Sequence, residues 1–413
     1  MAMEKGNAVV GQSGGPTAAI NATLAGVIKG CLAAKEIDKV YGMKNGVEGL
    51  SKEDFIILND YFGKSDREFN LLAATPSAAL GSCRKKIESD EQIEALYLIF
   101  EKYDIRYFFY IGGNDSMDAV AKLTDYANRN KENNIRTMYF IGVPKTIDND
   151  LYLTDHTPGY GSAAKYIAVS IQEIMRDCAV YNTKAVTIVE IMGRDAGWLT
   201  AAAALTKHIC GTGPKLIYLP ESVFDEEKFL TDIQTIFEND EEPYLVIAVS
   251  EGIKNKDKKY FAEAAMNGLT DSFGHKYLSG TGKYLENLVR ERIGCKVRSV
   301  ELNILQRCAS HIASKCDIDE SLRIGETAVR HAVSGESGKM MAFRRIKNAK
   351  SYSIDIFSED VCDIANKIKK IPKNYLKEDG TGVNDKCIEY MLPLIQGELE
   401  TTFEDGLPVH FEF

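Results

Sequence analysis

Residues 144–150, PKTIDND, place a lysine and two carboxylates in one short turn after a run of apolar residues. In an extended segment, residues two apart face the same way, so we expect Asp148 and Asp150 to point into one site. Two carboxylates there repel each other unless a cation or Lys145 compensates them. Such a cluster suits a base for an alcohol proton together with an anchor for magnesium. The alternative is a solvated acidic turn.

Two glycine-rich turns, residues 12–17 (QSGGPT) and 112–116 (GGNDS), each lie between a strand-like run and a helical one. Glycine lets the backbone approach a phosphate closely, and free N–H groups at a helix start favour negative charge. The first turn is not a Walker loop, because no Lys-Ser/Thr follows it. Tight turns also need glycine for steric reasons, and Asn114 or Asp115 could cap a helix. Two such turns in neighbouring units favour phosphate binding.

A fourth polar turn, MGRD at residues 192–195, follows the strand-like run KAVTIVEI. The guanidinium of Arg194 offers a planar fork of donors for a phosphate monoester, and Gly193 leaves room for it. The alternative is a surface ion pair between Arg194 and Asp195.

The elements that must position these turns alternate between β-branched or aromatic runs and longer helical stretches. This alternation predicts βαβ units and a parallel sheet covered on both faces, with ligands at the carboxyl ends of the strands. The expected strands cover residues 7–11, 106–111, 135–143, 184–191, 215–219, 244–249 and 297–303. The expected helices cover residues 18–35, 90–102, 115–130, 159–177 and 283–292.

Composition narrows the class of protein. The 413 residues, 45% hydrophobic and 27% charged, are enough for two or three domains with ordinary cores. A net charge of −10 disfavours nucleic acid and anionic membranes as partners. The nine cysteines include no CxxC pair, which favours a reducing compartment over a disulfide framework or a zinc site. We find no apolar run long enough for a signal peptide or membrane span, so we expect a cytoplasmic protein.

Taken in order, the motifs SGGP, GSCR, GGNDS, PKTIDND, MGRDAGW, SEG and QR resemble the phosphofructokinase family over about residues 6–345. The resemblance implies an α/β fold of two doubly wound, Rossmann-like domains with the active site in the cleft between them. We expect residues 1–155 and about 305–345 to form the phosphoryl-donor domain. The fructose 6-phosphate domain then takes about 156–304 and 346–413.

The resemblance also implies a role for each matching residue. Asp148 is the expected base for the sugar 1-hydroxyl, and the catalytic set is Asp148, Lys145, Asp115, Thr146 and Asp150. The expected donor-binding residues are Gly14, Gly15, Arg84, Gly113, Asn114 and Lys145. The expected sugar-binding residues are Thr146, Ile147, Asp148, Met192, Gly193, Arg194, Glu251, Arg298 and Arg307. Mg²⁺ is the expected cofactor, with Asn114 as a candidate ligand.

Two positions bear on the phosphoryl donor. ATP-using members of the family have GGDG, and here Asp115 replaces the final glycine, so its carboxylate would repel a nucleotide yet tolerate pyrophosphate. Lys145 is typical of the pyrophosphate-dependent branch and could neutralise the leaving phosphate. The resemblance therefore implies reversible transfer from pyrophosphate to fructose 6-phosphate, in glycolysis or gluconeogenesis. An ATP-dependent enzyme is the alternative, and a non-catalytic regulatory subunit is less favoured because it would not need this catalytic set.

Three positions depart from the family pattern. Asn114 stands where aspartate is usual, which weakens a direct magnesium contact. Ile304 replaces a histidine or tyrosine, and Ala185 replaces an arginine that many bacterial ATP enzymes supply from a neighbouring subunit. The family pairs subunits so that sugar-site residues cross an interface, so we expect a homodimer or homotetramer. The motifs do not explain the segment after about residue 347.

Overall fold

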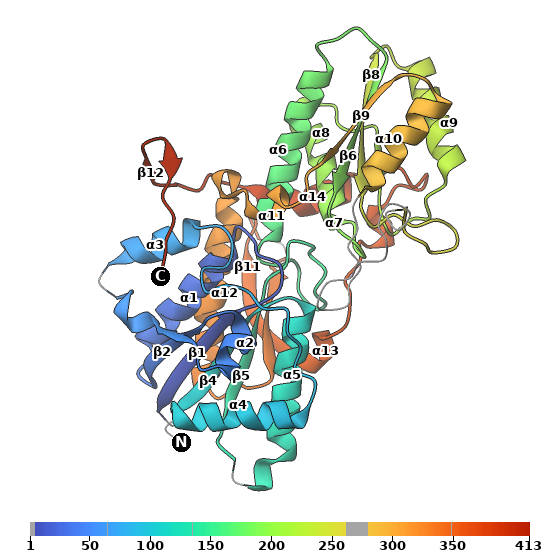
Figure 1. Ribbon diagram of the computed structural model, residues 1–413. Coiled ribbons are helices and arrows are strands. Elements are labelled where there is room, and N and C mark those ends of the chain that lie inside the picture. The colour runs from blue at the N-terminus through green and yellow to red at the C-terminus, as the bar shows by residue number, and fades with distance from the viewer. Residues whose placement is uncertain (1–4, 64, 134, 262–279, 348) are drawn as a thin grey trace.

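The computed structural model describes residues 5–63, 65–133, 135–261, 280–347 and 349–413, which form two lobes (Figure 1). The first lobe contains a seven-stranded sheet in the order β11-β10-β5-β4-β1-β2-β3. Its strands are β1 Gly6–Gln12, β2 Ile37–Met43, β3 Phe55–Ile57, β4 Ile105–Gly112, β5 Tyr139–Pro144, β10 Lys339–Arg345 and β11 Ile354–Asp360. The inner strands run parallel, whereas β3 and β11 pair antiparallel at the two edges.

Both faces of this sheet are covered by helices, so its central strands are apolar on both sides. Alternate residues of β4 enter different cores: Tyr107 and Phe109 pack with α1 and α12, and Phe108 packs with α4 and α5. The helices of this lobe are α1 Ile20–Ala33, α2 Gly46–Ser51, α3 Asp66–Ala74, α4 Asp90–Lys102, α5 Asn114–Arg129, α12 Lys315–Val333 and α13 Val361–Ile364. α1 and α12 can approach closely because Gly26 has no side chain. A Cβ at this position would lie 2.0 Å from the Leu322 carbonyl oxygen.

The second lobe is built on a four-stranded parallel sheet in the order β7-β8-β6-β9. Its strands are β6 Ala185–Ile191, β7 Leu216–Tyr218, β8 Tyr244–Ser250 and β9 Lys296–Glu301. The remaining helices are α6 Tyr160–Cys178, α7 Trp198–Ala201, α8 Thr206–Cys210, α9 Glu226–Asn239, α10 Thr281–Arg292, α11 Leu305–Cys308 and α14 Asp385–Met391. None of the helices within the described ranges is both long and apolar enough to span a membrane.

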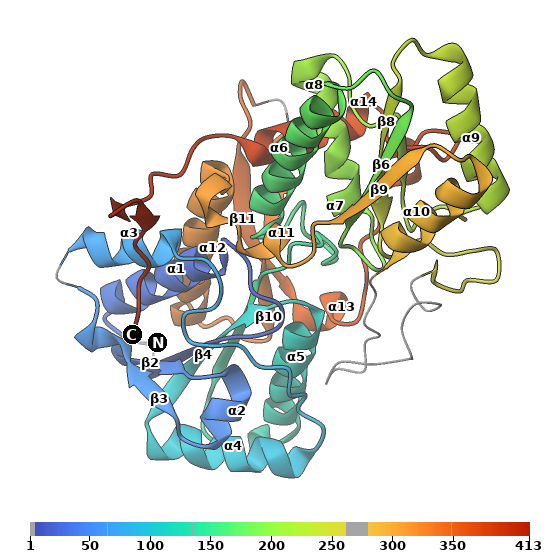
Figure 2. The ribbon, with the colours of Figure 1, turned by 45° about the horizontal axis from the view of Figure 1, so that its top comes forward.

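The C-terminal segment contributes residues to both lobes, and this corrects the expected division of the chain into two domains. Residues 346–413 were expected in the second domain, but β11 pairs with β10 in the first sheet. Figure 2 shows α13 beside α5, also in the first lobe. After α14 in the second lobe, the chain returns, and the Phe411 N–H donates to Thr75 Oγ1 at 2.8 Å. The pairing of β11 with β10 and the hydrogen bond of Phe411 thus return parts of this segment to the first lobe. A short hairpin follows α14, made of β12 Phe403–Glu404 and β13 Leu407–Pro408.

The expected strands and helices are present within two residues of the predicted bounds, apart from the third strand, which starts at Tyr139 rather than at residue 135. The doubly wound α/β class is confirmed. The sequence did not predict β2, β3, α12 or the hairpin of β10 and β11.

Candidate active site

A cleft of about 440 Å³ lies between the lobes, at the carboxyl ends of strands from both sheets. The first lobe contributes the turns after β1, β4 and β5, and the second contributes the turns after β6 and β8. The lining residues are Gly14, Gly15, Pro16, Thr17, Arg84, Lys86, Gly113, Asn114, Asp115, Ser116, Lys145, Thr146, Ile147, Asp148, Asp150, Met192, Arg194, Asp195, Ala196, Glu251, Arg307, Asn366 and Ile368.

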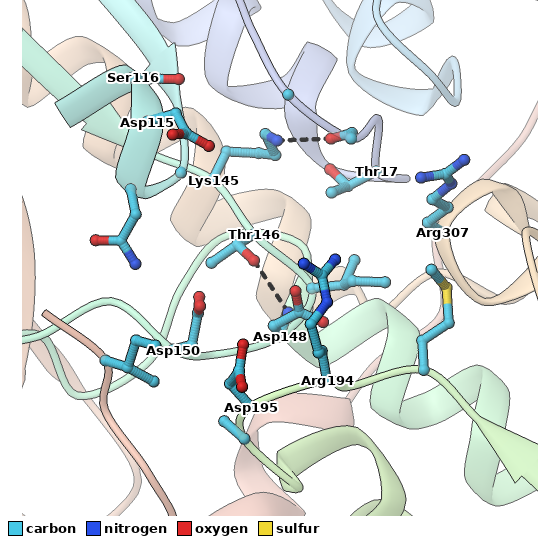
Figure 3. Close-up of a pocket in the computed structure, with 18 of the residues that line it drawn as sticks. Thr17, Asp115, Ser116, Lys145, Thr146, Asp148, Asp150, Arg194, Asp195 and Arg307 are labelled. Atoms are coloured by element: carbon cyan, nitrogen blue, oxygen red, sulfur yellow. Dashed lines mark hydrogen bonds between the residues drawn. The ribbon is translucent and has the colours of Figure 1, made fainter. Parts of the chain in front are cut away.

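Two cations converge on the glycine turn after β1. The Lys145 ammonium donates to the Gly15 carbonyl oxygen at 2.6 Å (Figure 3). A Cβ on Gly14 would stand 3.4 Å from Lys145 Nζ, and one on Gly15 would stand 3.3 Å from Arg307 Nη1. Gly14 also has φ of 77°, which favours glycine. Because Gly14 and Gly15 have no side chains, an anion can lie between their backbone and the side chains of Lys145 and Arg307.

The start of α5 supplies the next polar groups. Its N-cap is Gly113, and no side chain caps the helix, so the capping explanation for Asn114 and Asp115 is wrong. Asp115 Oδ1 instead lies 3.3 Å from Lys86 Nζ. Asn114 Oδ1 is buried and accepts no hydrogen bond from the described part of the chain. An oxygen in that state is available to a ligand.

The loop after β5 brings both carboxylates into the cleft, as predicted. Asp148 and Asp150 line the cleft, whereas Asn149 is fully buried and its Nδ2 donates to Tyr390 Oη at 2.9 Å. Thr146 Oγ1 accepts from the Asp148 N–H at 3.1 Å, which fixes the turn (Figure 3). The alternative of a solvated acidic turn is therefore wrong.

Burial shifts the pKa values of the ionisable groups in this loop toward neutral pH. The pKa of Asp150 rises to about 7 because the carboxylate is buried and faces Asp148. Burial also raises the pKa of Asp148, with Arg194 and Lys145 opposing the shift. The pKa of Lys145 falls to about 8, again because burial penalises its charge.

The second lobe supplies the facing wall. The Gly193 N–H donates to Glu251 Oε1 at 3.2 Å, and burial raises the pKa of Glu251 to about 8. Asp195 accepts from Lys254 at 3.3 Å and from Tyr260 at 3.2 Å, which does not support the ion pair with Arg194. Arg194 Nε is buried and makes no hydrogen bond with a described residue. Its guanidinium faces Asp148 across the cleft (Figure 3).

The structure brings all but two of the predicted site residues to the cleft wall. Gly193 does not line the cleft itself, but its N–H donates to Glu251, which does. Arg298 lies on the edge strand β9, half exposed, with Nη1 3.8 Å from Asp177 Oδ2. Within one chain, Arg298 therefore does not line the cleft, and its expected role in sugar binding stays a prediction.

The sequence analysis missed several lining residues, including Thr17, Lys86, Asn366 and Ile368. Thr17 and Lys86 had a signal, because Thr17 directly follows the SGGP motif and Lys86 lies two residues after GSCR. Asn366 and Ile368 had none, because they reach the cleft from the C-terminal segment.

The residues present fit a hydrated Mg²⁺ ion. In the described ranges, no group of three or more His, Cys, Asp or Glu side chains forms a metal cage. Mg²⁺ seldom uses such a cage, and instead takes one or two protein oxygens together with water and substrate phosphates. The unpaired Asn114 Oδ1 and the cleft carboxylates Asp148 and Asp150 are oxygens of this kind.

Glycine turns, cations and carboxylates at the strand ends of two α/β lobes define a class of proteins that bind phosphorylated ligands between domains. The model of the family Phosphofructokinase matches residues 7–332. The chain belongs to the phosphofructokinase family.

Relatives share nearly the full length of the chain. The pyrophosphate–fructose 6-phosphate 1-phosphotransferase of Halomonas elongata is 40% identical over 98% of this chain and 96% of its own. The protein of the same name from Xanthomonas campestris is 41% identical, with the same coverage. The crystal structure of pyrophosphate-dependent phosphofructokinase from Nitrosospira multiformis superposes with a TM-score of 0.87 at 36% identity, covering 98% of this chain and 96% of that one.

Proposed function

We propose that the chain transfers a phosphoryl group reversibly from pyrophosphate to the 1-hydroxyl of fructose 6-phosphate, giving fructose 1,6-bisphosphate and phosphate. The observation that carries this proposal is the cleft itself, where a cation-lined glycine turn faces paired carboxylates. Relatives that span nearly the whole chain carry the name of this activity.

Asp148 takes the proton from the sugar hydroxyl. Its raised pKa brings the carboxylate closer to the pH at which a general base works well. Lys145 and Arg307 hold the donor against the glycine turn, and Lys145 neutralises charge on the leaving phosphate. Arg194 and Glu251 orient the sugar from the opposite wall.

The donor is pyrophosphate rather than ATP. Asp115 projects into the cleft with Lys86 as its partner, so a nucleotide would have to displace an ion pair and meet a carboxylate. Mg²⁺, held by Asn114 Oδ1 and a cleft carboxylate, would neutralise phosphate charge when bound.

We also propose a homo-oligomer in which Arg298 reaches the sugar site of a partner subunit. Its position on the exposed edge strand β9 supports this, because an edge strand can approach another subunit. All nine cysteines are free in the structure, which supports a reducing compartment such as the cytoplasm.

Initial-rate assays of the purified protein with pyrophosphate or ATP test the function. We expect turnover of fructose 6-phosphate with pyrophosphate and a kcat/KM at least about 100-fold lower with ATP. Preference for ATP would overturn the donor assignment. Tight sugar-phosphate binding without turnover on either donor would point to a regulatory subunit.

A further inference from the structure

The loop after the catalytic carboxylates has an unusual backbone. Asn149 has φ of 53° and Leu153 has φ of 59°, and the left-handed region is unfavourable for a residue such as leucine. Such conformations persist only where the surroundings determine them. The contacts that hold residues 149–156 therefore control where Asp148 and Asp150 point.

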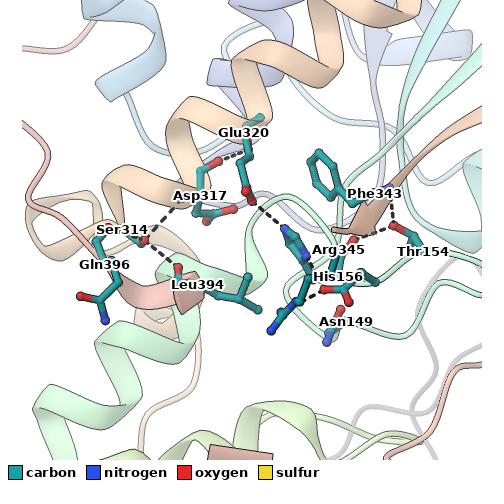
Figure 4. Close-up of polar contacts among 12 residues, drawn as sticks. Asn149, Thr154, His156, Ser314, Asp317, Glu320, Phe343, Arg345, Leu394 and Gln396 are labelled. Atoms are coloured by element: carbon teal, nitrogen blue, oxygen red, sulfur yellow. Dashed lines mark hydrogen bonds and ion pairs between the residues drawn. The ribbon is translucent and has the colours of Figure 1, made fainter. Parts of the chain in front are cut away.

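The far end of this loop is fixed to the first lobe by His156 (Figure 4). Its Nε2 lies 2.7 Å from Glu320 Oε2 of α12, and its ring stacks on Phe343 of β10 with centroids 4.5 Å apart. Thr154 Oγ1 also accepts from the Phe343 N–H at 2.9 Å. These contacts are several residues away from the reacting carboxylates.

The near end is held by a segment beyond the region that the family model matches. The Lys369 N–H donates to the Asp150 carbonyl oxygen at 2.7 Å, and Ile368 forms an antiparallel bridge with Leu151. This backbone pairing lies directly beside a cleft carboxylate.

The Lys369 side chain links the two ends of the loop formed by residues 149–155. Its ammonium donates to Asn149 Oδ1 at 2.9 Å, to the Thr154 carbonyl oxygen at 3.1 Å and to the Asp155 carbonyl oxygen at 2.9 Å. An ammonium has three donors, so all of them are used on the two ends of one loop. Burial lowers the pKa of Lys369 to about 7, because it penalises the charged form. The three acceptors compensate part of this penalty by binding the ammonium.

The same segment reaches the loop that carries Arg194. Trp198 Nε1 donates to the Lys369 carbonyl oxygen at 3.0 Å. Glu221 Oε1 accepts from both the Ile371 N–H at 3.1 Å and the Gly197 N–H at 3.0 Å. Residues 368–371 therefore connect the two loops that face each other across the cleft.

We propose that Lys369 is a positioning residue for phosphoryl transfer, which fixes Asp148 and Asp150 relative to Arg194 without touching substrate. The inference rests on the proposed function for the reaction that it assists. Its physical basis is that transfer needs reacting groups in near-attack geometry, so small displacements of the carboxylates slow the reaction.

Lys369→Met tests the proposal, because methionine keeps the unbranched apolar stem of lysine and removes the three donors. The matched control is Lys370→Met, since Lys370 is the next residue and is exposed. We expect kcat with pyrophosphate to fall about 10- to 100-fold in Lys369→Met, with each KM changed by less than about 3-fold. Lys370→Met should match the wild type, and Lys369→Arg should recover part of the loss.

Two readouts follow the loop without activity. Trp198 is the only tryptophan in the chain and contacts Lys369, so its emission should shift in Lys369→Met and not in the control. Amide hydrogen exchange over residues 149–155 should quicken in the same variant. If Lys369→Met does not fold, Lys369→Gln keeps a donor and should give a smaller loss of kcat with the same exchange pattern.

Unchanged kcat in a folded Lys369→Met protein, or equal losses in both methionine variants, would overturn the proposal. Faster exchange over the loop without loss of kcat would do so as well, because the anchoring would then be purely structural. Failure of the wild type to phosphorylate fructose 6-phosphate would instead overturn the proposed function. The exchange and emission measurements would then still report on the anchor.

Discussion

Replacing Asp115 with glycine should open the donor pocket to ATP. Asp115 projects from the first turn of α5 with its side chain 26% exposed. In the proposed function, its charge would lie where a nucleotide extends beyond the pyrophosphate moiety. At about 4 Å and an effective dielectric constant of about 20, two unit charges interact by about 4 kcal/mol. That value is a ceiling for the repulsion between this carboxylate and a nucleotide phosphate.

Lys86 reduces the ceiling, because its ammonium lies 3.3 Å from Asp115 Oδ1 and cancels part of the field. We therefore expect Asp115→Gly to gain about 1.4–2.8 kcal/mol, which is a 10- to 100-fold rise in kcat/KM with ATP. Lys86, left without this partner, should contribute by attracting the additional phosphate. The kcat/KM with pyrophosphate should change by less than about 5-fold, since pyrophosphate does not extend to this position.

The assay measures initial rates with each donor at saturating fructose 6-phosphate and magnesium. Asp115→Asn separates the two parts of the argument, because it keeps the size of the side chain and removes its charge. Asp125→Gly is the matched control: it places glycine, which is about 1 kcal/mol less favourable than alanine in a helix interior, in the same helix at an exposed residue far from the cleft. An unchanged ratio of ATP to pyrophosphate activity in Asp115→Gly would refute the exclusion argument.

Three further outcomes are expected. Asp148→Ala should lower kcat by about 10²- to 10⁴-fold while fructose 6-phosphate binding, measured by calorimetry, stays within a few-fold, and full activity would remove Asp148 as the base. Lys145 must be charged to assist, so kcat/KM for pyrophosphate should fall as pH rises through about 8, and Lys145→Arg should abolish that limb. Glu251 has a pKa of about 8 when folded against 4.5 normally, so its contribution to stability is complete below pH 4.5 and declines as pH rises through 8. Urea denaturation of Glu251→Gln across this range should show a shallower decline, and an identical slope would contradict the burial argument.

The parts of the site that could be predicted from sequence are those where local pattern and function coincide. The β4 run alternates between two cores, and the turns after β1, β4 and β5 follow strands, so their meeting at one edge follows from parallel-sheet geometry. The sequence pattern did not predict helix α12, because buried polar residues interrupt the apolar face of this helix. Asp317 accepts from the Gly159 and Ser162 N–H groups at 2.9 Å, and Glu320 contacts His156. Only the tertiary structure supplies the partners that make burial of these carboxylates acceptable.

The C-terminal contacts could not be predicted for a related reason. Lys369 is one of several lysines in a polar stretch, and nothing in that stretch distinguishes it from the exposed Lys370. What distinguishes it is the three oxygens that the 149–155 loop presents to it, and these exist only once the chain has folded. Long-range contacts of this kind leave no periodic signal, because neither partner's neighbours in sequence are constrained by them.

The charges of the cleft form one electrostatic system rather than separate sites. Lys145, Asp150 and Glu251 all have pKa values displaced to about 7 or 8, and burial is the first cause in each case. Arg194 Nε and Asn114 Oδ1 add buried polar atoms that no described residue satisfies. These groups oppose folding in the free protein, because buried charges and unpaired polar atoms are unfavourable. Their arrangement is stable only as part of a fold whose large apolar cores outweigh them. The phosphates and sugar hydroxyl of the proposed substrates, and the proposed magnesium ion, would supply the charges and donors that complement them.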